Sequence, residues 1–373
     1  MKRVAFLLTL ATTLALAVVA SAAPPPVDAE AYLVQNSGTG EVLASQNDRE
    51  QVPMASITKL MTAVVALEHA SLDDVATISS RTASVGESTI NLRPGERVTL
   101  RELIQAALIQ SANDAANAIA AFVGRGSVTR FVALMNARAQ ELGLSDTHFA
   151  NPDGLDAPDH YSSARDVTKL ARVAMNKPFI RETVRLVQAE AAGRRLHTWN
   201  DLLSTFPNLI GVKTGHTDGA GWSEVAAARR GGVTIYATLL GGASREGRNA
   251  DLAGLLTWGL TRFRTVWAID GDRTYGTVRT AYGKPAVRVV AGKPALRVIH
   301  VERPLVERVV IPVEAALPVR KGQRLGEVQV LDHGTVIARS PLVAAEAVDR
   351  PGTLGRVGFY AGRTLDHLGG LFG

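Results

Sequence analysis

The chain has 373 residues, of which 46% are hydrophobic and 20% charged, and it carries a formal net charge of +6. This length predicts two domains with room for a sizeable core, and the composition excludes a disordered or low-complexity protein. Because the chain contains no cysteine, disulfide frameworks, thiol catalysis and cysteine metal sites are also excluded, so the fold must rely on its core.

Residues 1–22 have the pattern of an export signal. Lys2 and Arg3 precede an apolar run over residues 4–19, and Ala20-Ser21-Ala22 forms a small-residue cleavage site. An uncleaved membrane anchor is the alternative, but the run is short for a span of about 20 residues. We expect export, cleavage near Ala23 and a linker over residues 23–28. Outside the cytoplasm, the basic balance favours anionic lipid or cell-wall polymer over nucleic acid as a partner.

The elements that follow begin with a strand pair and continue as helices. A glycine-containing turn over residues 37–40 joins the two strands, and Thr99 and Glu102 form a capping box at the start of one helix. Alternation, helical spacing and caps predict strands at 31–35 and 41–45, and helices at 57–67, 99–109, 114–123 and from Ser163 onward.

The chain then returns to strands, with a turn at residues 229–232. Strands are expected at 208–217, 224–228 and 233–240, followed by a helix over 249–260. A strand pair, many helices, a strand meander and a last helix form an α+β pattern in which the terminal segments share one antiparallel sheet. We assign this domain to residues 29–270.

Beyond residue 275 the helical periodicity of the sequence stops. Short Val/Ile runs alternate with Gly and Pro, which predicts a small all-β domain over residues 275–346. The tail over residues 350–373 places apolar residues such as Val357 and Leu365 at roughly helical spacing, with arginines between them. It is expected to lie on a membrane surface, although its glycines favour a frayed end as the alternative.

Ser56 and Lys59 form the first candidate chemical motif. Residues three apart lie on one face of a helix, so Lys59 is expected beside Ser56 in a turn that Ile57, Leu60 and Met61 bury. A desolvated lysine has a depressed pKa and can accept the serine proton. Taken alone, this spacing is common on exposed helices.

Ser111 and Asn113 form the second motif, in a polar break between two apolar helices. Ser111 could pass protons between nucleophile and leaving group, and the Asn113 amide could hold a substrate carbonyl. The alternative is an ordinary helix N-cap, because Ser and Asn are favoured there.

Lys213, Thr214 and Gly215 form the third motif, at the end of a predicted strand. Such a strand can accept an extended peptide, with Gly215 allowing close backbone approach and Lys213 and Thr214 donating to a carboxylate. The alternative is a solvated strand end.

In this order, Ser-x-x-Lys, Ser-x-Asn and Lys-Thr-Gly are the signature set of penicillin-recognising serine acyl enzymes. The sequence resembles the low-molecular-mass penicillin-binding proteins, the serine-type D-alanyl-D-alanine carboxypeptidases of peptidase family S11. The resemblance implies a β-lactamase/transpeptidase-like fold: an antiparallel sheet flanked by helices, plus a helical subdomain, followed by the small all-β domain. The longer matching segments are residues 39–43, 53–62, 92–96, 111–116, 161–166 and 211–215.

The resemblance also implies a reaction. Ser56 attacks the carbonyl of a D-Ala-D-Ala bond in a peptidoglycan stem peptide, with Lys59 as base. The backbone N–H groups of Ser56 and His216 form the oxyanion hole. Lys213, Thr214 and Arg248 bind the terminal carboxylate, although Arg248 could instead cap or solvate the start of its helix. β-Lactams are the expected inhibitors, and the expected location is the periplasm or the outer face of the bacterial cytoplasmic membrane.

No cofactor or metal is expected, because the histidines have no ligand spacing; solvated or core roles are expected for His69, His148, His160, His197 and His300. The chain departs from some family members at Asp153, where they carry histidine, and at Asn36, where aspartate is commoner.

Three other functions remain as alternatives. A D,D-endopeptidase would cut cross-links with the same residues, and the β domain favours the carboxypeptidase over it. A class A β-lactamase needs a glutamate followed at fixed spacing by an asparagine, and Glu141, Glu182 and Glu190 lack that partner. A non-catalytic wall-binding or β-lactam-sensing protein is the third alternative.

Overall fold

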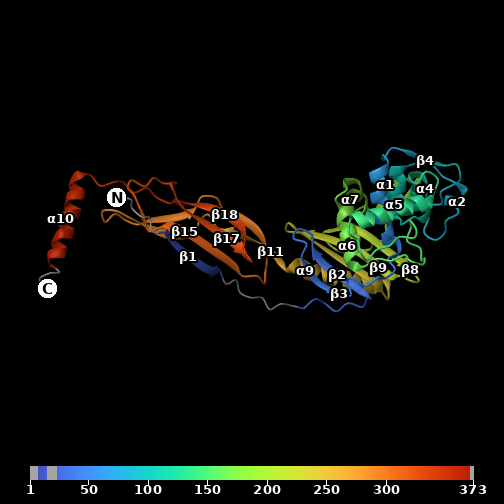
Figure 1. Ribbon diagram of the computed structural model, residues 1–373, viewed down its shortest axis with the longest axis horizontal. Helices are drawn as coiled ribbons and strands as arrows, with labels where there is room; N and C mark the ends of the chain where they lie inside the picture. Colours follow the sequence, from blue (N-terminus) through green and yellow to red (C-terminus); the bar gives the residue numbers. More distant parts are fainter. Residues whose placement is uncertain (1–6, 15–22, 370–373) are drawn as a thin grey trace. The chain divides into compact units, whose positions relative to one another are not determined.

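The computed structural model describes residues 7–14 and 23–369, and the side chains of residues 23–361 (Figure 1). The described chain divides into two compact units, one ending at Thr261 and one that begins at Arg262 and includes the strand Leu7–Leu14. Sequence patterning places the first domain's end later, at residue 270. The reason for the difference is that residues 263–269 form a strand that pairs inside the second unit.

The first unit is built on a five-stranded antiparallel sheet with the order β3-β2-β10-β9-β8. The N-terminal strand pair and the later meander therefore share one sheet, as the α+β pattern predicts. The strands are β2 (Ala31–Asn36), β3 (Val42–Gln46), β8 (Leu209–Thr217), β9 (Gly221–Arg230) and β10 (Val233–Gly242).

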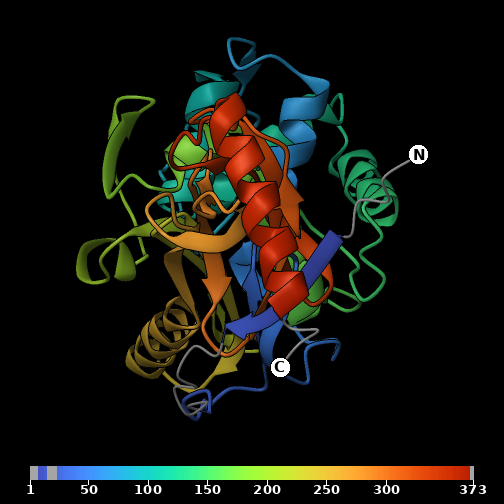
Figure 2. The same ribbon diagram turned by 90° about the vertical axis from the view of Figure 1, so that its left-hand side faces the viewer.

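Helices cover both faces of this sheet. On β10, Ile235 packs against Gly259 of α9 (Arg245–Thr261), where a Cβ would lie only 2.9 Å from the Ile235 side chain. Thr238 faces the other way, because side chains three apart on a strand point to opposite faces. Its hydroxyl lies 2.6 Å from that of Thr168 on α6 (Ala164–Met175). Figure 2 shows α9 as the gold helix at the lower left, next to the strands.

Most of the remaining helices form a subdomain on the α6 side of the sheet, whereas the short helix α8 packs beside β8 (Figure 1). The capping box at Thr99 is present, and Ser163 caps α6. The elements are η1 (Ala55–Thr58), α1 (Lys59–His69), α2 (Ser80–Ala83), α3 (Leu100–Ile109), α4 (Asn113–Val123), α5 (Val128–Glu141), α7 (Pro178–Thr183) and α8 (Leu202–Thr205), with the hairpins β4 (Val75–Thr77) with β5 (Arg97–Thr99) and β6 (Gln188–Ala191) with β7 (Arg194–His197).

The second unit is mostly β-structure with its own hydrophobic core, in line with the all-β prediction. Seven strands form a sheet of order β1-β15-β17-β18-β13-β12-β16, and β11 pairs with β14. The strands are β1 (Leu7–Leu14), β11 (Phe263–Ile269), β12 (Thr274–Thr280), β13 (Val287–Ala291), β14 (Ala295–His300), β15 (Leu305–Pro312), β16 (Glu314–Ala315), β17 (Arg324–Asp332) and β18 (Thr335–Ala344).

The predicted export signal (residues 1–22) and the predicted tail (residues 350–373) are described only in part. Within the predicted signal, residues 7–14 form β1, which pairs with β15, and residues 1–6 and 15–22 lie outside the described residues. The tail forms α10 (Thr353–Gly369), and residues 370–373 lie outside. Among the described residues, no single helix is long and apolar enough to cross a membrane; α4 and α5 meet that length and hydropathy only when taken together, across an 89° bend.

Candidate active site

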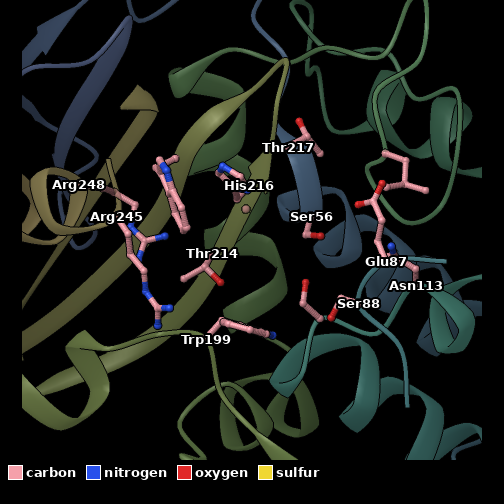
Figure 3. A pocket seen from close by; sticks show the side chains of 14 residues that line it. Ser56, Glu87, Ser88, Asn113, Trp199, Thr214, His216, Thr217, Arg245 and Arg248 are labelled. Atoms are coloured by element: carbon pink, nitrogen blue, oxygen red, sulfur yellow. The ribbon is translucent and has the colours of Figure 1, made fainter. Parts of the chain in front are cut away.

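A pocket of about 300 Å³ lies in the first unit where the sheet meets the helical subdomain. Figure 3 shows Ser56 near its centre, with Arg245 and Arg248 on one side and Glu87 and Asn113 on the other. The lining comes from η1, the loop between α2 and β5, the loop before α4 and its first residue, the ends of β8 and β9 that face each other across their turn, and the start of α9, with Leu155 and Trp199 from two further loops. All three predicted motifs therefore meet at one pocket.

Ser56 lies on η1, a 3-10 turn that leads directly into α1, rather than in the first turn of an α-helix. Side chains three apart eclipse in a 3-10 turn, so the Ser-x-x-Lys spacing still brings the pair together. Lys59 Nζ lies 2.7 Å from Ser56 Oγ, 2.7 Å from Asn113 Oδ1 and 2.6 Å from the backbone oxygen of Asp153.

The Lys59 side chain is fully buried, and this burial lowers its pKa to about 8. The nearby carboxylates of Asp153, Glu87 and Asp114 oppose the shift without cancelling it. A neutral lysine has two N–H donors and one lone pair. Since the Asn113 and Asp153 oxygens can only accept, they would take both donors and leave the lone pair for the Ser56 hydroxyl proton.

The backbone before Ser56 is held by a chain of buried hydrogen bonds. His160 Nδ1 accepts from the Ala150 N–H (3.0 Å), so its Nε2 carries the proton and donates to Thr58 Oγ1 (2.8 Å). Thr58 Oγ1 in turn donates to the carbonyl oxygen of Ala55 (2.8 Å), a residue with a positive φ of 49°. His160 therefore occupies one of the core roles expected of the histidines, and it supports the turn that carries Ser56.

Neither residue of the second motif occupies the N-cap position of α4, which belongs to Ala112. Ser111 has a positive φ of 63°, and its hydroxyl accepts a hydrogen bond from Lys213 Nζ at 3.0 Å. The Asn113 amide nitrogen donates to the Gly86 carbonyl (3.1 Å) while its oxygen faces Lys59. The structure thus does not bear out the N-cap alternative.

The third motif lies on β8 and is buried rather than a solvated strand end. Lys213 is 2% exposed, and burial together with the nearby Lys59 charge lowers its pKa well below the ordinary value. At Gly215, a Cβ would lie 2.9 Å from the Met54 carbonyl oxygen and 3.2 Å from the Ser56 nitrogen. Glycine here thus lets β8 approach η1, a close contact within the chain itself.

Arg248 is buried in α9, which begins at Arg245, four residues earlier than the periodicity predicts. Its Nε lies 3.2 Å from a carboxylate oxygen of Glu224, which is 0% exposed, and burial raises the pKa of Glu224 to about 7. Arg248 also lines the pocket and lies over the Trp222 ring. Because it is buried, it does not solvate the helix start, and among the described residues no contact shows its side chain capping that helix.

Sequence reasoning misses several pocket residues. Trp222 packs on the His216 ring at a centroid distance of 3.9 Å. Glu87, Trp199 and Arg245 also line the pocket. Glu87 and Trp199 lie in loops, and Trp222 and Arg245 lie at the starts of β9 and α9, so no sequence motif or periodicity marks them as pocket residues. Within the described part of the chain, no group of three or more acidic or histidine side chains is placed to hold a metal ion.

A serine hydroxyl beside a buried lysine of depressed pKa, in a pocket between a sheet and helices, defines a serine acyl-transfer enzyme. Residues 18–244 match the peptidase S11 family, described as D-alanyl-D-alanine carboxypeptidase, and residues 263–350 match the penicillin-binding protein 5 C-terminal domain. The chain therefore belongs to the peptidase S11 family of D-alanyl-D-alanine carboxypeptidases.

Named relatives and solved structures agree with this assignment. The D-alanyl-D-alanine carboxypeptidase DacD of Salmonella typhimurium is 32% identical over 362 residues, which is 90% of each chain. DacC of Escherichia coli is 32% identical over 89% of this chain and 87% of its own. Among structures, DacD of Francisella tularensis has a TM-score of 0.64 at 25% identity, covering 88% of this chain and 95% of its own. A Streptomyces DD-transpeptidase has a TM-score of 0.62 at 32% identity, covering 64% of this chain and 100% of its own.

Proposed function

We propose that this protein removes the terminal D-alanine from peptidoglycan stem peptides through an acyl-enzyme on Ser56. The observation that carries the proposal is the 2.7 Å contact between Ser56 Oγ and the buried Lys59 Nζ, at a pocket in an S11-family chain. β-Lactams would acylate the same serine, because they present a strained amide to the same nucleophile.

Acylation follows from the geometry. The neutral Lys59 amine takes the Ser56 proton while Oγ bonds to the carbonyl carbon. The oxyanion accepts hydrogen bonds from the backbone N–H groups of Ser56 and His216. The bond to the terminal D-Ala nitrogen then breaks, and a proton reaches that nitrogen through the Ser111 hydroxyl. Water then attacks the ester carbonyl: its hydroxyl stays on the shortened peptide, which is released, and its proton restores the Ser56 hydroxyl.

Substrate binding uses the rest of the pocket. The Asn113 amide, 2.7 Å from Lys59, orients the lysine and a substrate carbonyl. Lys213, Thr214 and Arg248 are the groups that bind the terminal carboxylate, because Thr214 and Arg248 line one end of the pocket and Lys213 lies behind it, 3.0 Å from the Ser111 hydroxyl. Gly215 keeps β8 close enough to η1 for the two oxyanion donors to converge.

The β-lactamase alternative gains no support from the site. Glu141, Glu182 and Glu190 are not among the residues that line the pocket, and Glu87 is the one carboxylate among the described lining residues. The endopeptidase and the non-catalytic alternatives use the same residues, and no observation favours either of them over the carboxypeptidase.

The site of action follows from the substrate. Peptidoglycan lies outside the cytoplasmic membrane, so we place the protein there, exported by residues 1–22. α10 would hold it at the membrane surface, with Leu354 (87% exposed) and Val357 (67% exposed) on its apolar side. Co-sedimentation with anionic vesicles tests this: the full chain should bind and a chain ending at residue 349 should not. Equal binding of the two would contradict it.

Mass spectrometry after incubation with penicillin tests the acyl-enzyme. The wild type should gain one adduct, mapped to Ser56, and release D-Ala from an acyl-D-Ala-D-Ala peptide. Ser56→Ala should do neither, whereas Ser45→Ala, which alters an exposed serine on β3, should do both. An adduct elsewhere, or fast penicillin hydrolysis without D-Ala release, would contradict the proposal.

A further inference from the structure

One wall of the pocket is built from two residues that the proposed reaction does not use. Trp199 follows β7, and Arg245 starts α9; both line the pocket. The Arg245 guanidinium carbon lies 5.6 Å from the centre of the Trp199 ring, a cation–π distance. Figure 3 shows Arg245 beside Arg248, and Trp199 below Thr214.

This wall is fixed from both sides of the pocket. Arg245 donates through Nε (2.8 Å) and Nη2 (2.6 Å) to the two carboxylate oxygens of Asp201. Asn249, one turn along α9, donates to the same carboxylate at 2.8 Å. On the other side, the Trp199 indole N–H donates to the carbonyl oxygen of Gln110, the residue before Ser111 (3.0 Å). Trp199 is nevertheless 49% exposed as a residue, and it lines the open pocket.

Trp199 and Arg245 lie where the leaving group of the proposed reaction would be. If the terminal carboxylate is bound by Lys213, Thr214 and Arg248, the departing residue lies at the cationic end, against Arg245 and Trp199. A terminal D-Ala has only a methyl side chain there. In a cross-link, the departing residue instead carries a long side chain that continues into a second stem peptide.

We propose that Trp199 and Arg245 close the leaving-group end of the pocket and restrict the enzyme to small C-terminal D-amino acids. This inference rests on the proposed function and deepens it, because it names residues that separate the carboxypeptidase from a D,D-endopeptidase. Pockets that discriminate by size typically do so by about tenfold or more, and the loss of a large ring should relax that discrimination.

The test compares leaving groups on the full chain. Release rates are measured for acyl-D-Ala-D-Xaa peptides in which Xaa is D-alanine, D-leucine or D-lysine, and for a cross-linked stem-peptide dimer. Trp199→Ala should raise the rate for the bulky leaving groups, relative to D-alanine, by about tenfold or more. Trp267→Ala, which removes a similarly exposed tryptophan (56%) from the second unit, should leave that ratio unchanged.

Arg245→Ala tests the same wall independently and should shift the ratio in the same direction. Thermal unfolding shows whether each variant is folded, and if Trp199→Ala is not, Arg245→Ala decides. An unchanged ratio in the folded variants overturns the inference. A wild type that releases no D-Ala overturns the proposed function instead, so the two failures are distinguishable.

Discussion

The Lys59 amine makes three short contacts, with Ser56, Asn113 and Asp153. Its protonation state decides whether it donates a hydrogen bond in all three or in only two. When the pH is above the Lys59 pKa of about 8, the neutral amine donates its two protons to the Asn113 and Asp153 oxygens, and its lone pair faces Ser56. When the pH is below this pKa, the protonated amine carries a third proton, which points at the Ser56 hydroxyl and prevents Lys59 from accepting the serine proton. The ionisation of one buried side chain therefore gates the nucleophile.

The acylation rate should follow this ionisation. Because the neutral amine is the active form, the second-order rate with penicillin should rise with pH through about 8. The neutral fraction increases roughly tenfold between pH 7 and 9, so stopped-flow acylation rates at these two pH values should differ by about that factor.

Two variants control this measurement. Lys59→Arg should lose acylation by a factor on the order of 10²–10⁴ and lose the pH profile, since arginine stays protonated. Lys177→Arg, which alters a surface lysine paired with Glu68, should match the wild type. A wild-type rate that is flat between pH 7 and 9 would rule Lys59 out as the base.

His160 should contribute to stability in a way that depends on pH. Burial lowers its pKa to about 4, below the ordinary 6.5 that applies when the chain is unfolded. The unfolded chain therefore binds more protons between these values, so the free energy of unfolding should fall as pH drops from 6.5 to 4. The nearby carboxylates of Asp153 and Asp156 oppose this lowering of the pKa, and the positive charges of His148 and Lys59 add to it, without reversing its direction.

Urea unfolding of the wild type and His160→Gln measures this effect. The variant should lose about 1–3 kcal/mol at pH 7, because buried groups lose hydrogen-bond partners. It should also show a weaker decline toward pH 4, and acylate more slowly because the Ala55 turn is less firmly held. His333→Gln, at an exposed position, serves as the control. If the two unfolding curves decline in parallel, the pH dependence comes from other groups.

Among the elements, the loop at residues 151–155 is what sets the shape of the turn before α1. Gly154 has a φ of +90°, and a Cβ there would lie 2.0 Å from the Ala55 carbonyl oxygen. The same loop provides the Asp153 carbonyl that holds Lys59. An alanine at Gly154 must therefore push the loop away from η1 and disturb the nucleophile and its base together.

Gly126 offers a matched comparison for this contact. Its φ is +88°, but no atom lies within 4 Å of the position of its Cβ. Both substitutions to alanine carry the backbone strain of a positive φ, which costs on the order of 1 kcal/mol. Gly154→Ala should lose at least about 2 kcal/mol more and most penicillin acylation, measured by urea unfolding and adduct mass. Equal effects of the two changes would mean that the close contact is unimportant.

Sequence periodicity predicts most elements because they are locally encoded. The capping box at Thr99 and the β8–β9–β10 meander are examples. The start of α9 is missed because Gly247 interrupts the helical pattern, although the Ser244 hydroxyl accepts from the Gly247 N–H at 3.0 Å. The motifs predict the residues around Ser56, since each motif is short and local. Trp199 reaches the pocket only through long-range folding, so no local pattern could reveal it.

At the scale of the whole molecule, the two units have separate hydrophobic cores. The first core includes Leu60 and Ile104, and the second includes Val289 and Val328. The predicted boundary at residue 270 lies beyond the structural division after Thr261. The apolar residues of β11 follow those of α9 without a break in the sequence, but β11 pairs with β14 and so belongs to the second unit. Every described residue that lines the active-site pocket belongs to the first unit.

The first unit should therefore fold and react without the second. A chain of residues 23–261 should be acylated by penicillin within about twofold of the full-length rate, because its core and pocket are intact. The Streptomyces DD-transpeptidase supports this expectation, since 64% of the present chain covers all of it. Calorimetry should show one unfolding transition for the short chain and a second one for the full chain. A chain ending at residue 349, which keeps both cores, is the control; if only that chain is acylated, the second unit is required for the pocket to form.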